Sequence, residues 1–208
     1  MEDMAFYVKA FITFFVLVNP LEGIPIFLDA TQKISPALRR AIALRASVAV
    51  TIIMLVSLFL GKAMLNVFGI SIGAFQVGGG IILFLIAVKM TLGSSDKSFV
   101  KGPGGEVGMD FAIVPLAIPL LAGPGAINGA VLYGTRTHSL VELGILSVII
   151  GAVGLATYGS IRAAVPLVKY LKETGISIAT RVMGLIISAI AVEMIGHGIG
   201  AMFSINVI

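Results

Sequence analysis

The chain has 208 residues, of which 58% are hydrophobic and 12% are charged, and its net charge at pH 7 is +4. Soluble globular domains are about 45–50% apolar and about 25% charged, so this composition excludes an ordinary soluble domain and indicates an integral membrane protein. The basic residues lie in short links between apolar runs, which argues against nucleic acid as a partner, and the absence of cysteine excludes disulfides and thiolate metal sites.

Six apolar segments are predicted as membrane-spanning helices, because each approaches the roughly 20 residues that a bilayer requires. They cover residues 5–29, 41–65, 69–91, 111–134, 139–160 and 180–203. The first begins with acidic residues and has no cleavage site, so we expect no signal peptide. A polar, glycine-rich linker at 93–109 separates a three-helix unit at 1–92 from another at 110–208. The predicted fold is an all-α membrane protein.

Two proline-rich stretches interrupt the first and fourth apolar segments. The first runs from Asn19 to Pro25 and the second from Ile118 to Pro124. Proline removes a backbone donor from a helix, and in hydrocarbon the freed groups are tolerated only where protein or a water-filled cavity satisfies them. One such motif is often only a packing kink, but a matched pair in two halves is typical of a transporter's substrate site. We therefore expect the first helix of each unit to be broken.

The two halves also repeat short motifs in the same order. Gly69-Ile70-Ser71-Ile72 recurs as Gly175-Ile176-Ser177-Ile178, and 87–90 resembles 191–194. Because each unit has three helices, an odd number, the second copy must enter the membrane from the opposite side. This pattern predicts two inverted three-helix repeats.

The distribution of basic residues predicts the orientation. Eleven of the 14 Lys and Arg residues lie in or beside the links after the first, third and fifth helices. By the positive-inside rule these links face the cytoplasm, and both termini lie outside. Arg162 to Gly175 is predicted to be a basic connector before the last helix.

The breaks predict a site for a small zwitterion. Proline suits the first position of a helix, so Pro25 and Pro124 are expected to begin second half-helices. The amides that follow, 26–28 and 125–127, would then be free donors for a carboxylate, and carbonyls released before the prolines would suit an ammonium group. The predicted substrate-binding residues are Asn19, Pro20, Glu22, Gly23, Pro25, Pro119, Gly123, Pro124, Gly125, Ala126 and Asn128.

Two acidic residues are candidates for proton coupling. Glu22 lies inside the first break, and an intramembrane acid is a functional hypothesis by default. It either carries the coupled proton or meets the substrate ammonium, or it caps the second half-helix. Glu193, in the last helix, either relays protons or only reaches the outer interface. No metal or other cofactor is expected.

Three segments carry a resemblance to a known family. Residues 18–27, 68–72 and 114–127, with the run Val114-Pro115-Leu116-Ala117-Ile118-Pro119, resemble the MarC/SnatA family, and the resemblance spans essentially the whole chain. It implies a six-helix protein of the prokaryotic cytoplasmic (inner) membrane. It further implies transport of small neutral amino acids such as glycine and alanine. The family usually has a small residue where this chain has Glu22.

The sequence thus predicts a secondary transporter, proton-coupled, that alternates access to a substrate held between the two breaks. The alternative is a channel or facilitator for small polar solutes, because inverted three-helix repeats with Asn-Pro motifs also occur in water and glycerol pores. An enzyme is not expected, since the sequence has neither Gly-x-Ser-x-Gly nor His-Glu-x-x-His. The expected partners are a small neutral amino acid and the lipid bilayer.

Overall fold

The computed structural model describes residues 2–93, 109–137 and 139–203. Every element in these ranges is helical, which confirms the all-α prediction. By length and composition, five described segments can each cross a membrane: Met4–Thr31, Pro36–Val67, Ile72–Leu92, Leu140–Arg162 and Thr174–Phe203. The predicted linker 93–109 lies, apart from its two end residues, outside the described ranges.

The first apolar segment consists of two helices, α1 (Glu2–Val18) and α2 (Pro20–Thr31). Between them Asn19 has a left-handed backbone, with φ 43° and ψ 65°. Asparagine is one of the few residues other than glycine that visits this region routinely. Pro20 follows at the first position of α2, where its missing amide removes no intrahelical bond.

The next two helices begin at serine caps. In α3 (Pro36–Val67) the Ser35 hydroxyl accepts a hydrogen bond from the Leu38 amide at 3.3 Å. In α4 (Ile72–Leu92) the Ser71 hydroxyl accepts one from the Ala74 amide at 3.1 Å. The helix therefore begins at 72 rather than at the predicted residue 69, because Gly69 forms a turn with φ 66°.

The predicted fourth span, 111–134, is divided into short elements. They are the 3-10 helix η2 (Met109–Ala112), the π-helix η3 (Ile113–Leu121) and α5 (Pro124–Arg136). Within η3 the backbone is extended at Val114 and Ile118, and Gly123 is extended before α5. Each of these residues directly precedes a proline, which disfavours the helical conformation at the preceding position.

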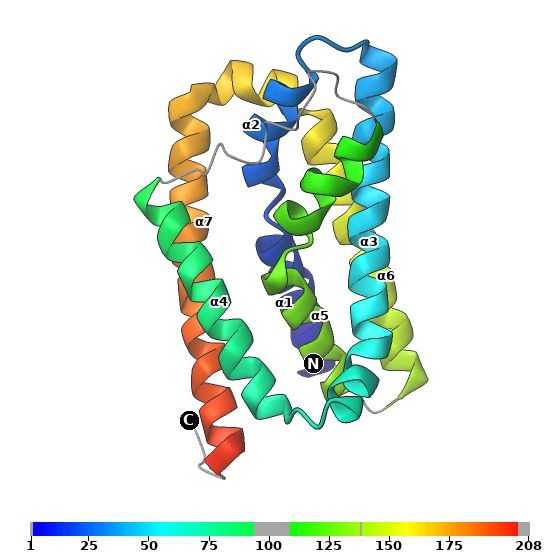
Figure 1. Ribbon diagram of the computed structural model, residues 1–208, viewed down its shortest axis with the longest axis vertical. Coiled ribbons are helices and arrows are strands. Elements are labelled where there is room, and N and C mark those ends of the chain that lie inside the picture. Colours follow the sequence, from blue (N-terminus) through cyan, green and yellow to red (C-terminus); the bar gives the residue numbers. More distant parts are fainter. Residues whose placement is uncertain (1, 94–108, 138, 204–208) are drawn as a thin grey trace.

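The last two helices are α6 (Leu140–Arg162) and α7 (Ala164–Phe203). The predicted connector 162–175 lies ahead of the last span, Thr174–Phe203, but most of it is helical, because α7 already begins at Ala164. Pro166 lies in its first turn, where proline is tolerated. Lys172 has φ 55° and kinks the helix, so its first part runs across one end of the molecule before the rest descends (Figure 1).

The helices are arranged around the interrupted segments. In Figure 1, α4 lies along α7 on one side and α3 along α6 on the other, with α1, α2, η3 and α5 between them. Small residues bring α4 and α7 close: a Cβ built on Gly73 would lie 2.8 Å from the Gly198 carbonyl oxygen. The outer faces are apolar; Val148 and Leu155 of α6 are each 73% exposed. Such faces suit contact with lipid and support membrane insertion.

Candidate functional site

The two interruptions pack against each other near the middle of the molecule (Figure 1). A Cβ built on Gly23 of α2 would lie 3.0 Å from Leu121 Cδ2 at the end of η3. One built on Gly125 of α5 would lie 2.5 Å from Leu83 Cδ1 and 3.6 Å from Leu17 Cδ2. Most predicted substrate-binding residues are therefore gathered where two discontinuous segments meet.

Asn19 shapes the first interruption and is only 5% exposed. Its Nδ2 donates to Glu22 Oε2 at 3.2 Å and contacts the Met90 sulfur of α4 at 3.9 Å. Pro20, beside it, is buried. The side chain of Asn19 thus links the interruption to the start of α2 and to a neighbouring helix.

Glu22 is half-buried and lies in the first turn of α2. Its amide donates to the Asn19 carbonyl at 3.1 Å, and its carboxylate accepts the Asn19 side-chain bond. A carboxylate is favourable there because a helix N-terminus carries partial positive charge. In the described structure the carboxylate is bonded to the Asn19 side chain and to no backbone amide, so capping, proton coupling and contact with the substrate ammonium all stay predictions.

Pro25 does not begin a helix, so this prediction is wrong. The second helix starts at Pro20, and Pro25 lies inside α2 with an exposed side chain. The reason is that the left-handed turn at Asn19 already breaks the chain six residues earlier. The first-turn donor of this helix is consequently the Leu21 amide rather than the predicted amides 26–28.

Pro124 begins α5 at its first position, as predicted. The preceding Gly123 is half-buried and extended, whereas Pro124 itself is exposed. The amides of Gly125 and Ala126, both buried residues, lie in the first turn and have no intrahelical partner. The Ile127 amide was predicted to be free, but it donates to the Gly123 carbonyl at 3.1 Å.

Asn128 extends the site toward α4. It is 2% exposed, and its Nδ2 donates to the Phe75 carbonyl at 3.2 Å. Its Oδ1 is buried without a hydrogen-bond partner in the described structure. A buried acceptor without a partner costs free energy, so this oxygen is poised to accept a bond from a donor that enters the site.

Pro119 and Glu193 lie in different parts of the molecule. Pro119 belongs to η3, within the second interrupted segment. Glu193 is exposed on α7, where its backbone carbonyl contacts His197 Nδ1 at 2.8 Å. It is not brought to the interruptions with the other predicted residues. In the described part of the chain, no group of three or more His, Asp or Glu residues could hold a metal ion.

Comparison with known proteins identifies the family to which this chain is related. The family described as "MarC family integral membrane protein" matches residues 4–203. The chain belongs to the MarC family.

Relatives of this MarC family protein occur in bacteria and archaea. It is 41% identical over 204 residues to the UPF0056 membrane protein YhcE of Escherichia coli (strain K12), covering 97% of this chain and 95% of the relative. It is 33% identical over 206 residues to a UPF0056 membrane protein of Pyrococcus abyssi, covering 99% and 100%. These names describe membrane proteins without stating a substrate. No solved structure matches the chain.

Sequence reasoning missed several residues at the centre of this MarC family protein. Leu17, Leu83 and Leu121 fill the space between the interruptions, and the backbone carbonyl of Phe75 holds Asn128. Leucine gives no sequence signal for a functional site, because it is common throughout apolar membrane segments. Gly79 did carry a signal, within three consecutive glycines, and it lies directly against the Asn128 side chain.

Proposed function

We propose that this MarC family protein is a secondary transporter of small neutral amino acids such as glycine and alanine, coupled to protons. The observation that carries the proposal is the meeting of two discontinuous segments, α1–α2 and η3–α5, at the middle of the molecule. Discontinuous helices near the bilayer midplane are the usual substrate sites of inverted-repeat transporters.

The polarity of these segments suits a zwitterion. The N-termini of α2 and α5 both lie at the interruptions, so first-turn amides of Leu21, Gly125 and Ala126 offer donors for a carboxylate. The partnerless Oδ1 of Asn128 offers an acceptor for an ammonium group. Leu121 packs against Gly23, and Leu17 and Leu83 pack against Gly125, so little room remains for a substrate side chain, which supports glycine and alanine over larger amino acids.

We further propose that six membrane segments form two inverted three-helix repeats. The first would comprise α1–α2, α3 and α4, and the second η3–α5, α6 and α7. In Figure 1 the first interrupted segment ascends and the second descends, which agrees with opposite insertion. The third members, α4 and α7, pack along each other. The repeated Gly-Ile-Ser-Ile motif supports the same division.

The proposed mechanism is alternating access. Leu121 packs against Gly23, and Leu17 and Leu83 pack against Gly125, so side chains occupy the space at the interruptions. A substrate would therefore have to displace one repeat relative to the other, with Glu22 as the proposed proton carrier. The proposed orientation in a prokaryotic inner membrane places the basic links in the cytoplasm and both termini outside.

Uptake of labelled glycine into proteoliposomes tests this function. We expect uptake that saturates with glycine concentration, increases with an imposed pH gradient and shows counterflow when the vesicles are preloaded with glycine. Empty liposomes and a large amino acid such as tryptophan serve as controls. Glycine flux that rises linearly without counterflow would indicate the channel alternative, and no flux above empty liposomes would contradict transport of glycine.

A further inference from the structure

A basic cavity lies at the end of the molecule where α2 ends and α3 begins. Its volume is about 140 Å³, several times the ~30 Å³ that one water molecule occupies in the liquid. It is lined by Phe27, Pro36, Arg39, Arg40, Ala43, Ile161, Arg162, Val165 and Pro166. Three of its nine lining residues are therefore arginines, contributed by two helices, and the other six are apolar. None of them belongs to the predicted substrate site.

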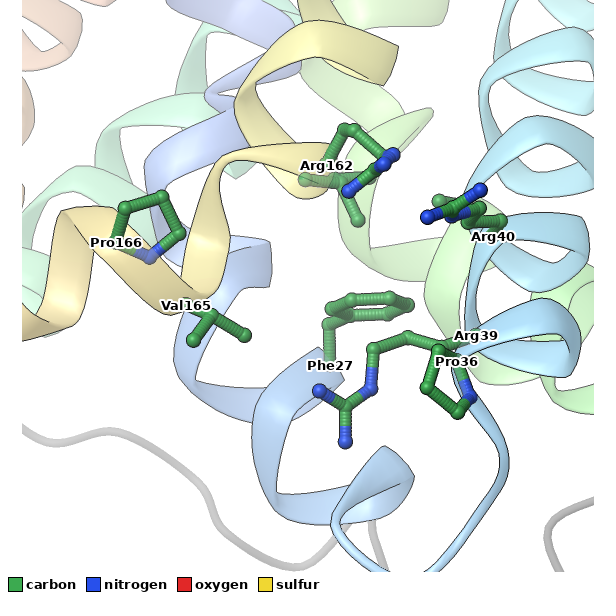
Figure 2. Close-up of a pocket in the computed structure, with 9 residues that line it drawn as sticks. Phe27, Pro36, Arg39, Arg40, Arg162, Val165 and Pro166 are labelled. Atoms are coloured by element: carbon green, nitrogen blue, oxygen red, sulfur yellow. The ribbon is translucent and has the colours of Figure 1, made fainter.

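The arginines are arranged around the ring of Phe27 (Figure 2). The guanidinium groups of Arg40 and Arg162 point toward each other, and that of Arg39 lies on the other side of the ring. The structure describes no ion pair between any of them and an Asp or Glu residue. Three positive charges around one cavity, with no described counter-charge, favour an anionic occupant.

Arg39 supplies the fixed part of the cavity. Its Nη2 donates to the Thr31 carbonyl at the end of α2 at 2.6 Å, which holds the side chain in place. Its Nε is buried and has no hydrogen-bond partner in the described structure. A buried, charged donor without a partner is costly, and an anionic oxygen in the cavity would satisfy it.

Helix ends of both kinds surround the cavity, so the arginines carry its preference for an anion. α3 begins at Pro36 and α7 at Ala164, and first-turn residues of both helices line the cavity. The Leu38 amide of α3 is already bonded to Ser35, and the partial positive charge of the two N-termini is offset by the partial negative charge where α2 ends at Thr31 and α6 at Arg162. Arginine forks match the geometry of phosphate oxygens, and basic pockets between helix ends bind phospholipid headgroups.

We propose that this cavity binds a phosphate group, either the headgroup of an anionic phospholipid or a free phosphate ion. The apolar walls formed by Val165 and Pro166 suit the glycerol and acyl region of a lipid whose phosphate lies among the arginines. The site does not depend on the transport function, because it shares no residue with the two interruptions.

The test compares two double variants with equal charge. Arg40→Gln with Arg162→Gln removes two exposed cavity arginines, and Arg45→Gln with Arg181→Gln removes two exposed arginines outside the cavity. Arg39 is left intact because its bond to Thr31 supports the fold. Native mass spectrometry of the detergent-purified chain measures bound phosphatidylglycerol, and isothermal titration measures binding of inorganic phosphate. Circular dichroism and gel filtration establish that all proteins are folded.

We expect saturable binding of one phosphate group per chain, weakened roughly tenfold or more in the cavity variant and little changed in the control variant. Binding of phosphatidylglycerol with this arginine dependence identifies a lipid site, and binding of inorganic phosphate alone identifies a free-anion site. Equal losses in both double variants would overturn the proposal, because the arginines would then act only through general surface charge. No binding of either probe would also overturn it.

Discussion

Asn19 is the residue at which the first membrane segment changes direction. Its left-handed backbone would be strained in most residues, and a β-branched side chain fits least well. The same residue uses its side chain to hold Glu22, so a local backbone break and a candidate charged group are coupled. Gly125 lies in the first turn after the second interruption, where its lack of a side chain lets α5 approach Leu17 and Leu83.

Enlarging Gly125 is expected to abolish glycine uptake. A Cβ there would lie 2.5 Å from Leu83 Cδ1, so the side chain in Gly125→Leu must displace the leucine and fill the proposed site. Overpacking of this kind costs about 1–3 kcal/mol of folding free energy, which leaves a folded protein measurable. Gly144→Leu is the control, because a Cβ at Gly144 has no atom within 4 Å. Normal uptake by folded Gly125→Leu in proteoliposomes would rule out the proposed pocket.

Glu22→Gln separates the two roles of this residue. If the carboxyl group carries the coupled proton, the variant loses pH-driven uptake but retains glycine exchange, because the amide cannot release a proton. Asp29→Asn is the matched control, since Asp29 is an exposed acid near the end of α2 and is not a candidate for proton coupling. The measurement is labelled-glycine uptake with and without a pH gradient. Undiminished pH-driven uptake in Glu22→Gln would leave Glu22 a capping residue only.

At the scale of elements, proline disturbs helices but does not always end them. Val114, Ile118 and Gly123 each precede a proline and each leave the helical region, so one predicted span becomes η3 and α5. Pro25 and Pro166 show the opposite result, because both lie within helices. A proline motif therefore predicts disturbance of a helix more reliably than the residue at which the helix ends.

The contact between α4 and α5 depends on Gly79. A Cβ there would collide with the Asn128 side-chain amide, so Gly79→Ala is expected to break the bond from Asn128 Nδ2 to the Phe75 carbonyl. Losing this bond and crowding the contact should lower stability by about 1–3 kcal/mol. Gly78→Ala is the control, because no atom lies within 4 Å of a Cβ at Gly78. Thermal unfolding in detergent measures the difference.

A second substitution tests whether the collision with the Asn128 amide causes this loss of stability. Asn128→Ala removes the colliding amide, so adding it to Gly79→Ala should cost less than the sum of the two single changes. Additive losses would mean that the two residues do not interact as described.

At the scale of the whole molecule, the start of α1 and the end of α7 lie toward one end, and the turn between α2 and α3 lies toward the other (Figure 1). Lys33 lies in this turn and Arg39 and Arg40 lie in the first turns of α3, and basic residues of this kind favour the cytoplasmic side. The basic cavity lies at the same end. The arrangement thus joins the proposed orientation to the proposed phosphate site, and one topology experiment bears on both.

Single introduced cysteines test this orientation, because the natural chain has none. Leu140→Cys lies at the start of α6 and is expected to react with a membrane-impermeant maleimide in intact cells, since Leu140 is 86% exposed. Gln32→Cys, an exposed position at the basic end, should react only after the membrane is permeabilised. The reverse labelling pattern would show that the basic links lie outside.

The sequence alone determined the membrane class, the helical fold, the approximate positions of the second, third and fifth spans, and the segments around the two breaks. These depend on composition and local chemistry: the length of the apolar runs, and proline at position 124. The tertiary structure decided that Asn19 rather than Pro25 makes the first break and that three leucines fill the space between the breaks. It also decided that arginines from α3 and α6 share one cavity. Such contacts join residues far apart in the chain, and no local pattern specifies which apolar or basic side chains will meet.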